Sequence, residues 1–244
     1  MGETQYDNPV FFEKYSQMTR SRQGLDGAGE WPTLEPLLPD FAGKRVLDMG
    51  CGYGWHCMYA AEHGAEQVIG FDPSEKMIAV ARGKNKSQRI IYQIGSMETM
   101  DYPNESFDVV FSSLALHYVE DYEAVVEKVR RFLKPDGEFL FSCEHPVFTA
   151  QGPQEWDYDE AGQIRCFPVD RYFYEGRREA VFLGETVKKY HRTLTTYLTT
   201  LLNCHFRIEA VAEPQPPQEW MNLPGMADEM RRPMMLIVKA RKEA

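Results

Sequence analysis

The stretch VLDMGCGYGWH, residues 46–56, decides the fold: an apolar run ends in an acid and breaks into three alternating glycines before an amphipathic segment. A glycine-rich turn between a strand and a helix lets a ligand approach the backbone, and ligands of open α/β sheets bind at the carboxyl ends of the strands. Such a turn can hold a pyrophosphate or a ligand that has no phosphate. The stretch therefore predicts a binding site beside a first strand.

Apolar runs alternate with amphipathic stretches from residue 44 onward, a pattern that predicts βαβ units and a parallel sheet. The predicted strands are 44–49, 66–72, 89–94, 106–113, 137–143, 206–211 and 234–241. The predicted helices are 54–65, 74–82, 121–134 and 194–202. We expect an α/β, Rossmann-like, seven-stranded and mostly parallel sheet with helices on both faces.

We expect a single domain, residues 1–244, in which the rest of the chain packs around this sheet. Residues 1–40 are expected to form a helical cap, from pieces at 8–18 and 31–38 that lie against the sheet. Residues 145–190 are rich in aromatic side chains and follow the fifth strand. A long insertion at this place predicts a segment that covers the substrate.

Composition narrows the function classes. A net charge of −10 argues against nucleic-acid binding, which needs an excess of clustered Lys and Arg. No apolar run reaches the ~18 residues of a membrane span, and the first residues do not resemble a secretion signal, so we expect a cytoplasmic protein. Five scattered cysteines without a CxxC pair predict reduced thiols and no metal site.

The glycine loop departs from the dinucleotide-binding pattern G-x-G-x-x-G. Gly50, Gly52 and Gly54 give G-x-G-x-G, and Trp55 occupies the position of the last glycine in that pattern. An indole there would hinder the approach of a pyrophosphate. Asp48, expected to face the site, would repel a pyrophosphate but favour an ammonium group. An NAD-dependent oxidoreductase is therefore kept only as the alternative.

With VLDMGCGYG as its first motif, the chain resembles the class I S-adenosylmethionine-dependent methyltransferases of the small-molecule kind, similar to the type 11 group that includes quinone-biosynthesis enzymes. The resemblance covers roughly residues 44–241. Its later motifs follow in the family's order: VIGFDPSEKM (68–77), GSMETM (95–100), SFDVVFSSLALHYVED (106–121) and LKPDGEFLFS (133–142).

This resemblance implies S-adenosyl-L-methionine as cofactor and S-adenosyl-L-homocysteine as product. It implies that Asp72 holds the ribose hydroxyls and that Ser96, which stands where the family has an acid, lies near the adenine. A closing N-terminal helix would bring Tyr15 to the cofactor and Arg20 to its methionine carboxylate. The expected cofactor residues are Asp48, Gly50, Cys51, Gly52, Gly54, Asp72, Pro73, Met77, Ser96, Met97, Ser113, Leu114, Tyr15 and Arg20.

The acceptor side carries no diagnostic motif. A methyl acceptor can require removal of a proton, and a histidine at the end of the fifth strand is the natural group to take it. His145, oriented by Glu144, is the first candidate, with His117 and His191 as the others; a buried structural histidine is the alternative for all three. The aromatic insertion favours a small-molecule acceptor with a flat or apolar part. A non-catalytic S-adenosylmethionine-binding protein and any oligomeric state remain open.

Overall fold

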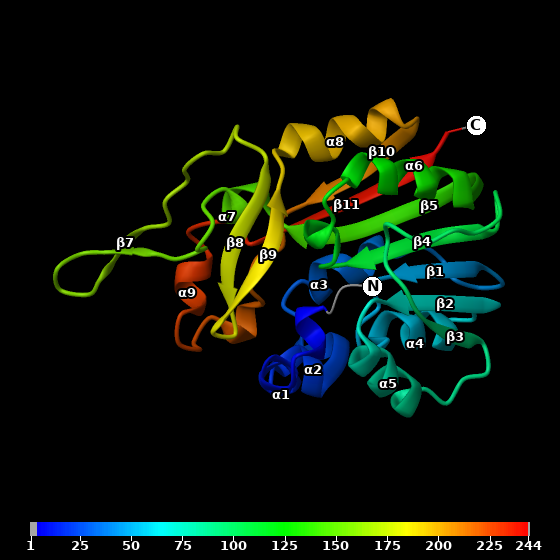
Figure 1. The fold of residues 1–244 in the computed structure, drawn as a ribbon, viewed down its shortest axis with the longest axis horizontal. Coiled ribbons are helices and arrows are strands. Elements are labelled where there is room, and N and C mark those ends of the chain that lie inside the picture. Colours follow the sequence, from blue (N-terminus) through cyan, green and yellow to red (C-terminus); the bar gives the residue numbers. More distant parts are fainter. Residues whose placement is uncertain (1–3, 244) are drawn as a thin grey trace.

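The computed structural model describes residues 4–243, which are built around a seven-stranded sheet in the order β10-β11-β5-β4-β1-β2-β3 (Figure 1). Neighbouring strands from β3 to β5 run parallel, whereas β11 is antiparallel to both β5 and β10. The strands are β1 (Arg45–Met49), β2 (Gln67–Asp72), β3 (Ile90–Ile94), β4 (Phe107–Ser113), β5 (Leu133–Glu144), β10 (Phe206–Ala212) and β11 (Met235–Lys242). The predicted Rossmann-like fold is confirmed.

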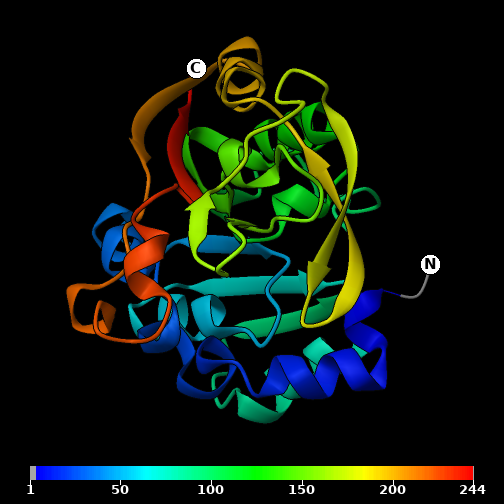
Figure 2. The ribbon, with the colours of Figure 1, turned by 90° about the vertical axis from the view of Figure 1, so that its left-hand side faces the viewer.

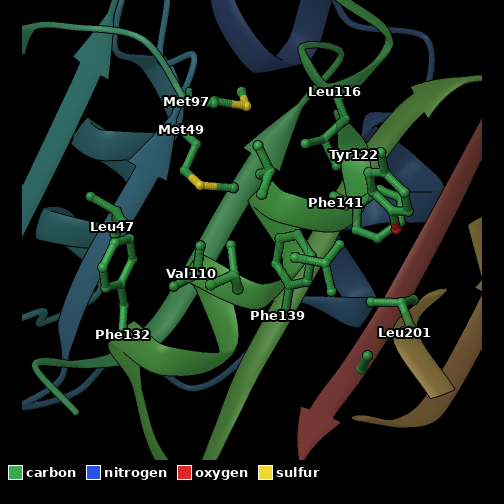
Figure 3. Packing of buried hydrophobic residues seen from close by; sticks show 14 of the residues in the cluster. Leu47, Met49, Met97, Val110, Leu116, Tyr122, Phe132, Phe139, Phe141 and Leu201 are labelled. Carbon is green, nitrogen blue, oxygen red and sulfur yellow. The ribbon is translucent and has the colours of Figure 1, made fainter. Parts of the chain in front are cut away.

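Helices cover both faces of the sheet because successive residues of each strand point to opposite sides. Val46 and Val68 pack against α4 and α5, whereas Leu47 packs in the cluster that holds α6 and α8. Figure 3 shows Leu47 beside Phe132 of α6, and Leu201 of α8 at the edge of the same cluster. The bounds are α4 (Trp55–Glu62), α5 (Glu75–Lys84), α6 (Tyr122–Phe132) and α8 (Leu194–Asn203).

The N-terminal pieces are helical, as predicted, but they pack on different partners. They comprise η1 (Gln5–Asp7), α1 (Pro9–Ser16), α2 (Thr19–Gln23), η2 (Gly24–Gly27), α3 (Trp31–Leu34) and η3 (Glu35–Leu37). Helix α3 lies against the sheet, where Trp31 and Leu34 meet Phe111. Helix α1 does not lie against the sheet, because its fully buried Phe11 packs on Ala180 of a distant hairpin.

That hairpin is the main feature of the aromatic insertion, and no sequence pattern had indicated it. Strands β8 (Gly176–Phe182) and β9 (Glu185–His191) are joined by Leu183 and Gly184, both at positive φ, +54° and +77°. This is the conformation of a two-residue hairpin turn. Figures 1 and 2 show the hairpin standing across the end of the sheet with its turn near α1, where Lys14 Nζ donates to Leu183 O at 2.9 Å.

The remaining elements are short: η4 (Leu116–Tyr118), α7 (Pro146–Thr149), β6 (Asp157–Tyr158), β7 (Ile164–Cys166), η5 (Gln218–Trp220) and α9 (Met226–Glu229). Strand β5 begins at Leu133, earlier than expected, because α6 already ends at Phe132. Four of the five cysteines are buried as free thiols, while Cys166 is exposed. In the described part of the chain, no helix has the length and apolar character needed to cross a membrane.

Candidate active site

A cavity of about 810 Å³ opens where β1, β2 and β4 end, and the N-terminal segment and the β8–β9 hairpin contribute to its walls. This is the edge at which open α/β sheets bind their ligands. The cavity brings together most of the residues singled out from the sequence. Those that line it are Tyr15, Arg20, Gly50, Cys51, Gly52, Asp72, Pro73, Met77, Ser96, Met97, Ser113, Leu114 and His117.

The loop after β1 lines the cavity, and two of its lining residues are glycines that expose their backbone. Gly50 has a φ of +74°, and a Cβ added there would lie 2.5 Å from Ala115 Cβ. Gly52 also has a positive φ, +52°. The N–H groups of Gly50 and Cys51 both donate to Phe71 O, at 2.9 and 3.0 Å, which fixes the loop against β2. The positive φ therefore favours glycine at both Gly50 and Gly52, and at Gly50 a side chain would also clash with Ala115.

The third glycine and the tryptophan after it have different roles. Gly54 is not among the described residues that line the cavity; a Cβ there would lie 2.1 Å from Tyr92 Oη, so the glycine permits packing beneath the loop. Trp55 does line the cavity and forms part of its wall. Its ring packs under Gly24, and Lys84 Nζ lies 4.6 Å from the ring centroid.

Asp72, at the end of β2, presents a carboxylate to the cavity. Its Oδ2 accepts from Gly52 N at 3.0 Å and its Oδ1 accepts from Ser74 N at 2.9 Å. Burial raises the pKa of Asp72 to about 6, against the effect of these two bonds. Ser74 Oγ in turn donates to Asp7 Oδ1 at 2.7 Å, so the N-terminal segment is tied to the same corner.

Asp48 does not face the cavity as expected. It is 2% exposed beneath the glycine loop, where Cys57 Sγ donates to its Oδ2 at 3.1 Å. Its Oδ1 has no hydrogen-bond partner among residues 4–243. Burial raises the pKa of Asp48 to about 7. The expected contact of Asp48 with a ligand is therefore corrected to a position that supports the loop, because the side chain points into the layer between sheet and α4.

The backbone after β4 reaches the cavity through a strained residue. Leu114 has a φ of +51°, which is uncommon for a residue with a branched side chain. Its N–H donates to Ser142 O at 2.9 Å, which holds this conformation. Ser142 Oγ also donates to Ser113 Oγ at 3.2 Å. The strain thus turns the chain from β4 into the wall of the cavity.

The N-terminal segment contributes polar side chains that the sequence analysis only partly identified. Arg20 lines the cavity, but its Nη2 already lies 2.9 Å from Oε1 of Glu30, a carboxylate that is almost fully buried. Tyr6 Oη lies 3.1 Å from Tyr118 Oη, across the cavity wall. The sequence did not indicate Glu30, Tyr6 or Tyr118. Each of them contacts a partner whose spacing along the chain follows no helix or strand period, so no sequence pattern predicts the contact.

Two of the three candidate histidines are not brought to the cavity. His145 caps the N-terminus of α7, its Nδ1 accepting from Val147 N at 3.0 Å and its Nε2 lying 2.8 Å from Glu213 Oε1. His191 is fully buried in the insertion, where its Nε2 lies 2.8 Å from Tyr172 O. Neither belongs to the described lining of the cavity. Their expected placement is corrected, and both fit the structural alternative.

His117 and Glu144 do line the cavity. His117 is 2% exposed, and its Nδ1 accepts from the backbone N–H of Glu144 at 3.2 Å. Burial, with a contribution from the nearby Lys189, lowers the pKa of His117 to about 4. Glu144 does not orient His145; its Oε1 accepts from Lys189 Nζ at 2.5 Å and its Oε2 accepts from Gln154 Nε2 at 2.7 Å.

Comparison with known proteins gives the family. A model of the methyltransferase domain matches residues 47–141. A structure from Listeria monocytogenes, assigned to the S-adenosylmethionine dependent methyltransferases, is 52% identical, with a TM-score of 0.87 over 91% of this chain and 100% of the other. A second structure, from Mesorhizobium loti, is 44% identical, with a TM-score of 0.83, and the match covers 90% of this chain and 100% of the other. The ubiquinone biosynthesis O-methyltransferase of Idiomarina loihiensis is 42% identical over 41% of this chain and 42% of its own length.

These similarities agree with the geometry. The matched domain, residues 47–141, contains the glycine loop, Asp72 and the strained turn after β4. The two structures extend the likeness over about nine tenths of the chain. None of these three relatives is an oxidoreductase, and the NAD-dependent alternative gains no support. The chain belongs to the class I S-adenosylmethionine-dependent methyltransferases.

Proposed function

We propose that this enzyme transfers a methyl group from S-adenosylmethionine to a small molecule bound in the same cavity. The observation that carries the proposal is one cavity of about 810 Å³ that is lined by the glycine loop and Asp72 and also by His117 and Glu144. Small-ligand sites occupy roughly 300–1,000 Å³, so this volume suits a cofactor together with a small acceptor. The net charge of −10 disfavours a nucleic-acid acceptor.

The residues at the loop fit this cofactor. At Gly52 the place that a Cβ would take is open, with nothing within 4 Å, so a ligand can approach the backbone there. The Asp72 carboxylate is aligned by two backbone N–H groups, which leaves lone pairs free to accept hydrogen bonds from ribose hydroxyls. Met77 and Met97 give the wall an apolar surface suited to a purine ring.

The other end of the cofactor would meet the residues that follow β4 and the N-terminal segment. Ser113 and Leu114 would lie beside the methionine portion, with Arg20 available to its carboxylate while Glu30 keeps the guanidinium in place. Bound S-adenosylmethionine supplies an electrophilic methyl group on a positively charged sulfur. The chain's own contribution is alignment of the two reactants and exclusion of water by the N-terminal segment and the hairpin.

The first test is cofactor binding measured by isothermal titration calorimetry with S-adenosylhomocysteine. Asp72→Ala removes the carboxylate, and the loss of about 1–3 kcal/mol corresponds to roughly 5- to 150-fold weaker binding. Asp101→Ala is the matched control, because that carboxylate is 77% exposed and is paired with Arg131 at the surface. Equal affinities for wild type and Asp72→Ala would remove Asp72 from the site.

The second test separates an enzyme from a non-catalytic binder. The protein is incubated with radiolabelled methyl donor and a panel of small hydroxyl, amine and thiol compounds, and label in the acceptor fraction is counted. Transfer to at least one compound is expected from a cavity that holds both reactants. Tight binding of S-adenosylhomocysteine without transfer to any class of acceptor would favour the binder instead.

A further inference from the structure

The acceptor end of the cavity contains a neutral hydrogen-bond donor. Nδ1 of His117 accepts the Glu144 N–H, so the proton of the neutral imidazole lies on Nε2. The lowered pKa of His117, about 4, keeps the ring neutral at physiological pH. No described residue accepts a hydrogen bond from this Nε2, and His117 is part of the cavity wall. In this tautomer the ring can donate a hydrogen bond but cannot take a proton at Nε2.

Beside it lies a carboxylate that stays ionised. Burial alone would raise the pKa of Glu144, but the adjacent Lys189, and the hydrogen bonds from Lys189 and Gln154, bring it below its usual value. Lys189 Nζ also donates to Gln154 Oε1 at 2.9 Å, which closes a triangle of three side chains. Each Glu144 oxygen accepts one hydrogen bond in this triangle and keeps a lone pair for a ligand.

The charges around the pair favour an uncharged ligand. Lys189 is taken up by Glu144 in a largely buried ion pair. An anionic acceptor placed between His117 and Glu144 would meet the Glu144 carboxylate at close range and would have to break this ion pair, which is costly. An ammonium group would be stabilised by Glu144 in its protonated form, which has no lone pair to attack a methyl group. A hydroxyl group is therefore the acceptor that these side chains suit best.

We propose that His117 and Glu144 form the acceptor-binding pair of this methyltransferase, and that they select a neutral phenolic compound whose hydroxyl lies beside a second oxygen. Glu144 accepts a hydrogen bond from the hydroxyl that is methylated, and His117 Nε2–H donates to the neighbouring oxygen. The aromatic side chains Tyr6, Tyr118 and Phe182 in the same lining provide contact for a flat ring. This inference rests on the methyl-transfer function proposed above.

The proton balance follows from the same pair. As the bond from the acceptor oxygen to the methyl carbon forms, the bond from that carbon to sulfur breaks and its electron pair stays on sulfur. Positive charge then develops on the acceptor oxygen, and its proton becomes acidic enough to pass to the Glu144 carboxylate. Glu144, whose pKa is low, releases that proton to water. Glu144 is thus a catalytic residue, whereas His117 binds and orients.

The test uses the full-length protein saturated with S-adenosylhomocysteine and four probes: catechol, phenol, benzylamine and phosphoethanolamine. Calorimetry should show catechol binding about five- to tenfold more tightly than phenol, since it makes one further hydrogen bond to His117. Phosphoethanolamine should bind more weakly than phenol, and benzylamine, which Glu144 would hold as its ammonium form, should not be methylated. Methylation with a labelled donor should occur on catechol.

Variants separate the two roles. His117→Asn should remove the preference for catechol over phenol while leaving phenol binding unchanged, and Glu144→Gln should weaken both ligands and abolish transfer. Matched controls are His205→Asn and Glu213→Gln, both at exposed positions outside the described cavity lining. An unchanged affinity for S-adenosylhomocysteine shows that each variant is folded.

Three results would overturn the inference: no binding of catechol at millimolar concentration, methylation of the amine or tighter binding of the phosphorylated probe than of phenol, or an equal effect of His117→Asn on phenol and catechol. The catechol-to-phenol ratio of the wild type needs no variant, so the inference stays testable even if Glu144→Gln does not fold. Failure of S-adenosylhomocysteine to bind would instead contradict the proposed function itself.

Discussion

Replacing Asp48 by asparagine should make the stability of the unliganded protein less dependent on pH. Asp48 is 2% exposed, and burial raises its pKa from 3.8 to about 7. Because the folded-state pKa lies above the unfolded one, the contribution of Asp48 to stability is greatest below about pH 4 and is lost as the pH rises through about 7. An asparagine side chain does not ionise, so this pH-dependent contribution to the free energy of unfolding is absent from the variant.

The size of the effect follows from the shift. About three pKa units correspond to about 4 kcal/mol, of which about 2.5 kcal/mol falls between pH 5 and pH 8. The substitution also places an amide where Asp48 Oδ1 has no described partner, at a cost of about 1–3 kcal/mol that does not depend on pH. The difference between variant and wild type should therefore move by about 2.5 kcal/mol in favour of the variant over this range.

Urea unfolding followed by circular dichroism at pH 5, 6, 7 and 8 measures this change. Asp72, whose pKa is about 6, titrates in both proteins and largely cancels in the difference. Asp101→Asn serves as the control, because it makes the same change of side chain at a position that is 77% exposed. A difference that stays constant within about 0.5 kcal/mol from pH 5 to pH 8, or that moves in the opposite direction, would refute the raised pKa of the buried Asp48.

Two further substitutions test the packing around the cavity. Gly54→Ala should lower the free energy of unfolding by about 1–3 kcal/mol, since its Cβ would lie 2.1 Å from Tyr92 Oη at a φ of +76°; a melting temperature equal to that of the wild type would contradict this. Arg20→Met should cost about 3–5 kcal/mol at pH 8, because it leaves Glu30 buried without its partner. Urea unfolding at pH 8 measures this loss, and an unchanged free energy of unfolding would exclude the ion pair.

The sequence by itself determined the sheet and the loop that borders the cavity. Strand periodicity, the alternating glycines and the acid at the end of β2 are local features, and Asp72 lies in the cavity lining because parallel strands end at one edge of the sheet. Its contact with the cofactor stays a prediction. Gly50 and Gly52 were identified for the same reason, since a turn needs its own residues to adopt positive φ.

Only the tertiary structure decided the acceptor end. Glu144 and His145 are neighbours, and successive side chains at a strand end point in opposite directions, so a shift of one residue exchanges which of them meets the cavity. The pairing of β5 with β11 and the approach of Lys189, 45 residues away in sequence, settled it in favour of Glu144. Periodicity reports which side chains share a face; it does not report which distant segment covers that face, because long-range packing depends on partners that lie far apart along the chain.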